Sequence, residues 1–206
     1  MLIQISTHMH VHKYAYARMH THAELTPAGV EQAKTLQQGD AGRVGSSIEL
    51  VVASSLTRAI QTADLVFPSQ LCACPRVSLD VWREVSGLLV NAKRRTRTEL
   101  QDTHKSWNFD HLENEEDVLW TPEALESQTA CAHRAYLALK WAWQRPEEHI
   151  GIVAHGGNHL NQLSQYNTSS HARTLGHGSQ AVRYAHTPSC ISSHASPLIF
   201  TLFSSV

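Results

Sequence analysis

The stretch Ile-Gly-Ile-Val-Ala-His-Gly-Gly, residues 150–157, decides how the chain folds. Its short β-branched, apolar run is typical of a buried strand, and the two glycines after the histidine permit a sharp turn into a helix expected over 158–165. His155 is therefore expected at the carboxyl end of a strand and at the amino end of a helix. Open α/β sheets bind ligands at that edge, and helix amino ends favour anions. The alternative is a glycine turn beside a buried histidine that has no chemical role.

The composition restricts the class of protein. The chain has 206 residues, which suits one well-packed domain, and its 17 Lys and Arg nearly balance its 18 Asp and Glu. That balance argues against nucleic acid or an anionic membrane as a partner. No apolar run approaches the roughly 18 residues needed to span a bilayer, and residues 1–10 lack the pattern of a secretory signal. The cysteines show no disulfide framework, so we expect a soluble, reduced, cytoplasmic protein; they are Cys72, Cys74, Cys131 and Cys190.

Histidine is the unusual residue, with 15 copies. Three of them, His8, His10 and His12, alternate just after an apolar stretch at residues 1–6 that is a candidate first strand. Alternate side chains share one face of a strand, so the run is a possible half of a metal site. A surface or loop run of histidines without a metal is the other interpretation.

Further along the chain, strands and helices are expected to alternate. The sequence predicts strands at 48–53, 76–82 and 150–154, and helices from Leu25-Thr26-Pro27 onward, at 56–67 and at 121–143. The last of these helices has an apolar stripe expected to face the core, formed by Leu125, Ala132, Tyr136, Leu139 and Trp143. The alternation predicts a single-domain α/β fold, with a mostly parallel open sheet and helices on both faces.

Two segments fall outside that regular pattern. Residues 88–121 combine basic, aromatic and acidic clusters without periodicity, and we interpret them as a lid or insertion within a domain over 1–165. The basic cluster there, at 93–97, is for the most part expected to be a solvated surface. Residues 166–206 are rich in Ser and His and resemble a disordered tail, with one possible edge strand at 197–203.

Two polar residues follow predicted strands. Arg58 lies in the first turn of the helix after 48–53, where a guanidinium beside free backbone amides could bind a phosphate. Glu84 follows the strand at 76–82, where partial burial could raise the pKa of its carboxyl and suit it to general acid catalysis. A solvated arginine and a solvated loop glutamate are the alternatives. Together with His155, they make a credible phosphoryl-transfer site.

Four stretches resemble the histidine phosphatase superfamily, which has the phosphoglycerate mutase-like fold. They are Leu-Thr-Pro-Ala-Gly-Val-Glu-Gln-Ala (25–33), Val-Val-Ala-Ser-Ser-Leu-Thr-Arg-Ala-Ile-Gln-Thr-Ala (51–63), Ala-His-Gly-Gly (154–157) and, for the plant, algal and fungal branch, Asp-His-Leu-Glu-Asn-Glu-Glu-Asp-Val-Leu-Trp (110–120). The resemblance covers about residues 24–160.

The resemblance implies a mechanism through phosphohistidine. A histidine attacks the phosphoryl group, two arginines and a second histidine hold its oxygens, and a carboxylic acid protonates the leaving oxygen. His8 matches the nucleophile, Arg58 one arginine, His155 the second histidine and Glu84 the proton donor. The chain departs from the pattern at Thr7, where the family has an arginine. The resemblance implies a small phosphorylated substrate and no metal or organic cofactor, and it leaves the oligomeric state open.

Three hypotheses follow from the sequence. The first is a phosphomonoester phosphatase or mutase-like enzyme that works through His8, Arg58, Glu84 and His155. The second is a catalytically impaired, phosphate-binding domain, because a neutral Thr7 removes one charged phosphate contact. The third is a metal-binding hydrolase that uses the histidine run from His8 to His12.

Overall fold

The computed structural model describes residues 22–155 and three later strands. The expected strand at 1–6 and helix at 158–165 lie outside the described residues. In chain order the elements are α2 (Pro27–Gln38), α3 (Asp40–Gly45), β1 (Leu50–Ser54), α4 (Thr57–Val66), β2 (Arg76–Leu79), the 3-10 turns η1 (Asp80–Trp82) and η2 (Val90–Ala92), α5 (Arg97–Thr103), α6 (Gln128–Trp143), β3 (His149–His155), β4 (Ala172–Leu175), β5 (Val182–Ala185) and β6 (Leu198–Ser204).

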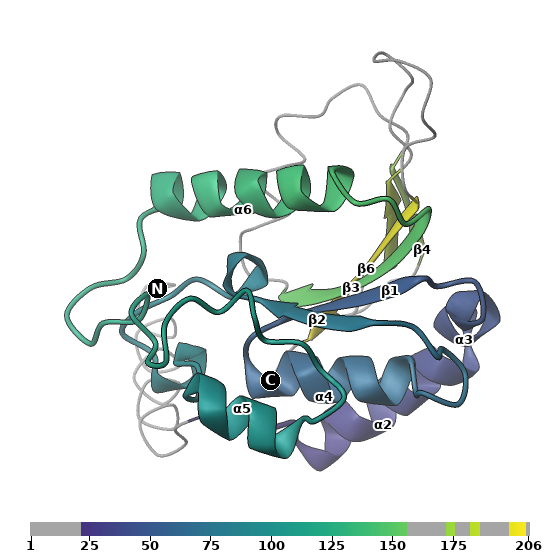
Figure 1. Cartoon of the computed structure of the whole chain (residues 1–206), viewed down its shortest axis with the longest axis horizontal. Coiled ribbons are helices and arrows are strands. Elements are labelled where there is room, and N and C mark those ends of the chain that lie inside the picture. Colours follow the sequence, from purple (N-terminus) through teal and green to yellow (C-terminus); the bar gives the residue numbers. More distant parts are fainter. Residues whose placement is uncertain (1–21, 156–171, 176–181, 186–197, 205–206) are drawn as a thin grey trace, which may run out of the picture.

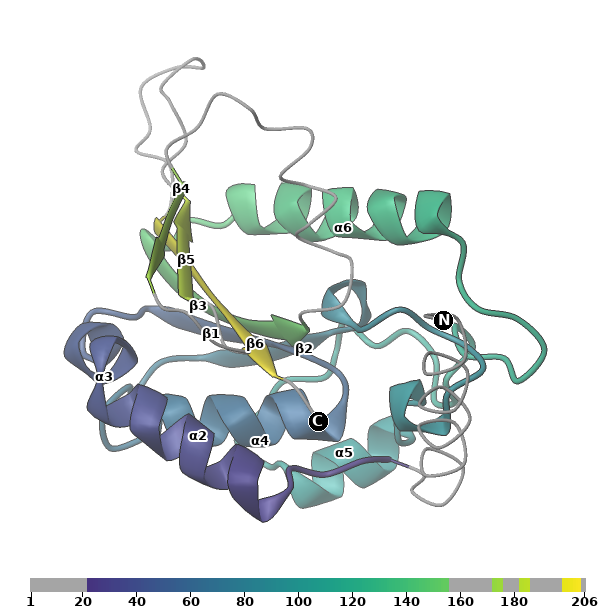
Figure 2. The same cartoon turned by 180° about the vertical axis from the view of Figure 1, so that it is seen from behind.

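The strands form one sheet in the order β2-β1-β3-β6-β5-β4. The first four run parallel, and β5 and β4 are antiparallel to their neighbours. Helix α6 covers one face of the sheet, while α2, α4 and α5 lie on the other (Figure 1), as the view from behind also shows (Figure 2). The predicted α/β fold, with a mostly parallel sheet and helices on both faces, is confirmed.

The sheet separates two apolar cores, and strand β1 contributes side chains to both. Val51 and Ala53 point to the side of α2 and α4, and Leu50 and Val52 point to the side of α6. This alternation follows from the two-residue period of a strand. In β3, a Cβ on Gly151 would lie 3.1 Å from the ring of Phe67, so the glycine of the opening stretch lets α4 approach the sheet closely.

The helix predicted to open at Leu25-Thr26-Pro27 is α2, and its cap is confirmed. The Thr26 side chain accepts a hydrogen bond from Gly29 N, and Pro27 occupies the first helical position. The predicted strand at 48–53 is β1, and the helix predicted at 56–67 is α4. The short helix α3 follows α2 directly and precedes β1.

The prediction for the longest helix was wrong at its start. Helix α6 begins at Gln128, with Ser127 as its cap, and not at Thr121. The Thr121 hydroxyl instead donates to the nearby Glu123 carboxylate. The predicted core stripe was also wrong, since three of its members are 42–56 % exposed: Leu125, Tyr136 and Trp143. The buried face consists mainly of small residues, Cys131, Ala135, Ala138 and Ala142, together with Arg134.

The possible edge strand at 197–203 exists as β6, but it lies inside the sheet. It pairs with β3 on one side and β5 on the other. Its sequence, Leu-Ile-Phe-Thr-Leu-Phe, is apolar at both alternating sets of positions, as an interior strand requires. Strands β4 and β5 also lie within the stretch for which we expected no regular structure.

Two further features bear on the expectations from composition. Cys72 and Cys74 are joined in a disulfide, which we did not expect. Within the described part of the chain, no helix is both long and apolar enough to cross a membrane.

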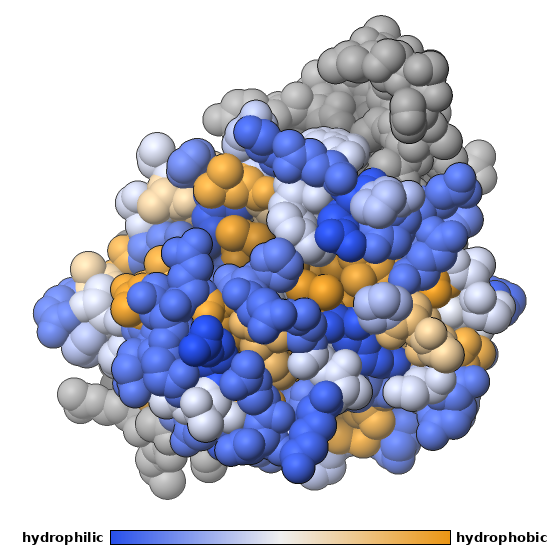
Figure 3. All heavy atoms as spheres, in the orientation of Figure 1, coloured by the Kyte–Doolittle hydropathy of each residue, from blue (hydrophilic) through white to orange (hydrophobic). Residues whose placement is uncertain are grey.

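The face seen in Figure 3 is mostly hydrophilic, and apolar residues show between α6 and the sheet and over the loop before α6. The exposed apolar residues around that loop are Leu88, Val118, Leu119 and Leu125.

Candidate active site at the carboxyl edge of the sheet

Arg58 is a buried cation at the start of α4. It is the second residue of that helix and is 3 % exposed. Its Nη1 donates to the Asn91 carbonyl at 2.7 Å, and among the described residues its Nε has no hydrogen-bond partner. Burial lowers its pKa to about 10, although the charge of Glu84 acts in the opposite direction. The guanidinium therefore stays charged at neutral pH, close to the Glu84 carboxylate and at a helix end that favours anions.

Glu84 follows a strand that is shorter than predicted. Strand β2 ends at Leu79, and η1 then turns the chain toward Arg83 and Glu84. The Glu84 residue is half-buried, and its Oε1 accepts a hydrogen bond from Val85 N at 3.1 Å. The Glu84 carboxylate thus lies at the same edge of the sheet as Arg58. The backbone of the segment that carries Glu84 is hydrogen-bonded to the rest of the fold.

His155 is the last residue of β3 and is 1 % exposed. Its Nε2 lies 2.8 Å from Oγ of Ser54, the last residue of the neighbouring strand β1. The same Oγ accepts a hydrogen bond from Leu56 N at 3.3 Å, just before α4 begins. The Ser54 hydroxyl therefore connects His155 to the turn that leads into α4, the helix of Arg58. The predicted position of His155, at the end of a buried strand on the carboxyl edge of the sheet, is confirmed.

The predicted nucleophile, His8, lies outside the described residues, as do Thr7, His10 and His12. The structure therefore places Arg58, Glu84 and His155 at the carboxyl edge of the sheet, and their joint role and that of the fourth member, His8, stay predictions. Among the described residues, no group of three or more His, Cys, Asp or Glu side chains could hold a metal ion.

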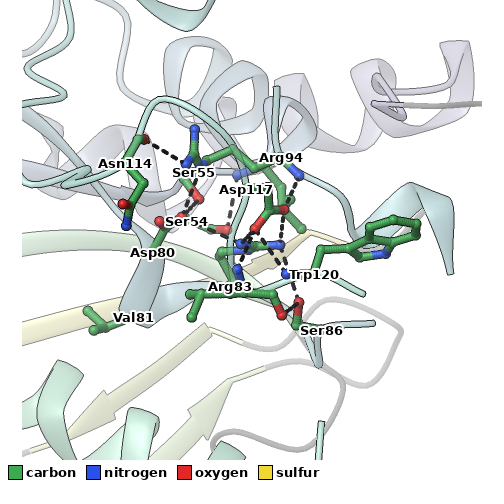
Figure 4. Close-up of polar contacts among 12 residues, drawn as sticks. Ser54, Ser55, Asp80, Val81, Arg83, Ser86, Arg94, Asn114, Asp117 and Trp120 are labelled. Carbon is green, nitrogen blue, oxygen red and sulfur yellow. Dashed lines mark hydrogen bonds and ion pairs between the residues drawn. The ribbon is translucent and has the colours of Figure 1, made fainter. Parts of the chain in front are cut away.

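A buried ionic network supports the site and was not predicted from the sequence (Figure 4). Arg83, next to Glu84, donates through Nη1 and Nη2 to the two carboxylate oxygens of Asp117 at 2.5 and 2.7 Å. The same guanidinium also donates to the Ala92 carbonyl at 2.6 Å. Burial alone would raise the pKa of the Asp117 carboxyl, but hydrogen bonds and charge from Arg83 and Arg94 hold it below its usual value.

Arg94 fixes the segment that we interpreted as a lid. Its guanidinium donates to four backbone carbonyls, those of Arg95, Asn114, Glu115 and Glu116. Its Nε also lies 3.3 Å from Asp80, whose carboxylate accepts from Ser55 just after β1. The expectation of a solvated basic surface is therefore wrong for Arg94, because its side chain is 1 % exposed. The segment also contains regular structure in η2 and α5.

A family model for the histidine phosphatase superfamily, branch 1, matches residues 7–174 of the chain. The chain belongs to the histidine phosphatase superfamily. The match begins before His8 and extends beyond β3, so it includes every candidate residue of the site.

Similar curated proteins include two phosphoglycerate mutase-like proteins and a phosphomutase-like protein. The chain is 30 % identical over 171 residues to an Arabidopsis thaliana "Phosphoglycerate mutase-like protein", covering 70 % of this chain and 63 % of the relative. It is 28 % identical over 176 residues to "Phosphoglycerate mutase-like protein 1" of the same plant, covering 72 % and 62 %. It is 30 % identical over 142 residues to "Phosphomutase-like protein 3" of Candida albicans, covering 66 % and 44 %. The chain thus spans less than two thirds of these relatives.

Solved structures similar to this superfamily member include two mycobacterial proteins. "Mycobacterial hydrolase 2" is 18 % identical, with 88 % of this chain and 80 % of that chain covered and a TM-score of 0.48. A mycobacterial glucosyl-3-phosphoglycerate phosphatase is 19 % identical, with 89 % of both chains covered and a TM-score of 0.44.

Three supporting residues of the site were not predicted from the sequence. Ser54 contacts His155 across two strands that are far apart in the sequence, so only their pairing reveals the contact. Arg83 and Asp117 form an ion pair across 34 residues, and neither position shows a pattern by itself. The available signal concerned Asp117 alone, which belongs to an acidic run in the same segment as the basic cluster at 93–97.

Proposed function

We propose that the chain catalyses phosphoryl transfer from a small phosphorylated substrate through a phosphohistidine, as a phosphomonoester phosphatase or a mutase-like enzyme. The observation that carries the proposal is the buried, charged guanidinium of Arg58 at the carboxyl edge of the sheet, together with Glu84 and His155. Phosphoryl transfer needs clustered positive charge around the moving group more than it needs covalent chemistry from the protein.

The proposed steps assign each residue one task. An imidazole nitrogen of His8 attacks phosphorus and forms an N–P bond while the ester P–O bond breaks. The protonated carboxyl of Glu84 gives its proton to the leaving oxygen, which departs as an alcohol. Water then attacks the phosphohistidine, the Glu84 carboxylate takes a proton from that water, and inorganic phosphate is released. Arg58 and His155 hold the phosphoryl oxygens during both transfers.

Turnover of an aryl phosphate at mildly acidic pH tests the proposal. We expect hydrolysis by the wild-type chain and its loss in His8→Ala and His155→Ala. His133→Ala is the matched control, because His133 is an exposed histidine on α6. A labelled phosphoryl group should become protein-bound, stable in base and labile in acid, and absent from His8→Ala. No turnover by the wild-type chain would refute the proposal.

Thr7 favours a second candidate, a phosphate-binding domain with impaired catalysis. Loss of one bidentate arginine contact weakens transition-state binding by on the order of a few kcal/mol. A thermal melt separates the two functions, since a ligand that binds the folded state raises its stability. Inorganic phosphate that stabilises the fold without any hydrolysis supports the second function, and robust turnover excludes it. The small phosphorylated substrate and the cytoplasmic location remain predictions.

A further inference from the structure

Arg134 of α6 contacts the backbone of the segment that carries Glu84. Its Nη1 donates to the Arg83 carbonyl at 2.8 Å and to the Val81 carbonyl at 3.3 Å, and its Nη2 donates to the Glu84 carbonyl at 3.2 Å. The residue is 8 % exposed, so these hydrogen bonds are largely shielded from water. One side chain therefore holds three carbonyls within four successive residues.

Glu126 completes this arrangement from the loop before α6. Its carboxylate accepts hydrogen bonds from Arg134 Nε, at 2.9 Å, and from Arg134 Nη2. The same carboxylate accepts from Ser86 N at 3.2 Å, and Glu126 N donates to the Ser86 carbonyl at 2.8 Å. Arg134 and Glu126, which we call the α6 clamp, thus hold both sides of Glu84 along the chain and neutralise each other's charge.

The Glu84 carboxylate lies in the same neighbourhood as the α6 clamp. Burial raises the pKa of the Cys131 thiol, and the charges of Arg134, Glu126 and Glu84 all act on it. Cys131 lies on the buried face of α6, one turn before Ala135. The carboxylate that acts on Arg58 is therefore also close to the face of α6 that carries the clamp.

Only an arginine can make this set of contacts. A guanidinium has five N–H donors in a rigid plane, which can reach several carbonyls and a carboxylate at once. A lysine keeps the charge but offers one flexible ammonium, so it cannot hold three carbonyls and a bidentate carboxylate together. The contacts are to backbone, which sets the position of Glu84 without using its carboxylate.

We propose that the α6 clamp is the positioning device for the general acid: Arg134 and Glu126 hold Glu84 where its carboxyl can protonate the leaving oxygen of the substrate. This inference rests on the proposed function. A general acid must come within about 2.6–3.2 Å of the atom that it protonates, so a small displacement of the segment removes proton transfer. The arginine itself does not touch the substrate.

The dependence of kcat on the leaving group of the substrate tests whether the α6 clamp positions the general acid. p-Nitrophenyl phosphate releases a weakly basic phenolate that needs little protonation, whereas β-glycerophosphate releases a strongly basic alkoxide. Because general acid catalysis contributes about 10²–10⁴-fold, we expect Arg134→Met to lower kcat for β-glycerophosphate at least tenfold more than kcat for p-nitrophenyl phosphate. Arg134→Lys should recover only part of the difference, and KM should change little.

The controls separate the possible outcomes. Arg145→Met should leave both rates unchanged, because Arg145 follows α6, pairs with Glu147 and lies over Trp141. Equal losses on both substrates in Arg134→Met would overturn the positioning role while leaving the proposed function intact. A wild-type chain that is inactive on both substrates would overturn the proposed function and this inference with it. If circular dichroism shows that Arg134→Met does not fold, Glu126→Gln replaces it in the same comparison. A larger loss of kcat for β-glycerophosphate than for p-nitrophenyl phosphate supports the positioning role, and equal losses overturn it.

Discussion

Replacing Asp117 by asparagine should remove a large part of the stability of the fold. The side chains of Arg83 and Asp117 are 1 % and 0 % exposed, so the buried arginine would lose the carboxylate that it contacts at 2.5 Å and keep only the more distant Asp80, at 3.7 Å. The carboxylate also accepts hydrogen bonds from three backbone amides, those of Arg94, Leu119 and Trp120. Breaking a buried pair from one side costs about 3–5 kcal/mol, against a total of about 5–15 kcal/mol for a typical domain.

Urea unfolding measures this effect directly. For a chain of this size, about 3–5 kcal/mol corresponds to a melting temperature lower by about 6–20 °C. Glu116→Ala is the matched control, since Glu116 is the adjacent exposed carboxylate and should change stability by no more than about 0.5 kcal/mol. The double variant Arg83→Met with Asp117→Asn should be more stable than Asp117→Asn alone, because it removes the unpaired buried charge and keeps a side-chain oxygen that can accept from the backbone amides.

The pH dependence of stability provides a second readout for Asp117. The pKa of its carboxyl is lower in the folded state than its ordinary value of 3.8. Its contribution to the free energy of unfolding is therefore complete above about pH 4 and is lost as the pH falls through the lowered pKa. The difference between wild type and Asp117→Asn should shrink in acid. A destabilisation below about 1 kcal/mol at pH 7, or a difference that grows in acid, would refute the account of the buried pair.

Three further predictions concern the site and its loop. Ser54→Ala should lower kcat about 3- to 10-fold, the loss expected for one hydrogen bond, because it removes the Ser54 hydroxyl that contacts His155 Nε2. The control is Ser46→Ala, which changes an exposed serine and should have no effect in the same assay. Arg58→Met should weaken binding of inorganic phosphate about 10- to 150-fold by calorimetry, and wild-type binding should fall as the pH rises through about 10, where the Arg58 guanidinium loses its proton. Gly87→Ala should lower the urea midpoint by an amount equivalent to about 1–3 kcal/mol, because Gly87 has φ +91° and a Cβ there would overlap the Ala124 carbonyl; an unchanged midpoint would contradict that strain.

The regular elements with local signals were predictable from the sequence. Strands β1 and β3 are short apolar runs, and Thr26-Pro27 marks the start of α2 by a cap and a proline at the first position. Each of these signals is contained within a few residues. The positions of Arg58 and His155 were predictable for the same reason, because the residues immediately beside them indicate the helix start that carries Arg58 and the strand end that carries His155.

Features that depend on distant partners were not predictable in the same way. Thr121-Pro122-Glu123 has the composition of a helix start, but the loop to Glu126 is held by Ser86 and Arg134, so α6 begins at Gln128. The basic residues at 93–97 gave no indication that Arg94 would be enclosed by carbonyls from residues 114–116. A buried charge is recognisable only when its partners are known, and those partners lie about 20 residues away.

The position of β6 has a consequence for how the chain folds during synthesis. Strand β3 ends at His155 and its neighbour β6 ends at Ser204, so 49 residues (204 − 155) must be made before β3 is paired on both edges. At about 5–20 residues per second, the ribosome needs about 2–10 s for that length. During this time β3, apolar from Ile150 to Ala154, presents an open edge to any other strand. The nascent chain is therefore most vulnerable to aggregation in this interval, which is when a chaperone would protect it most.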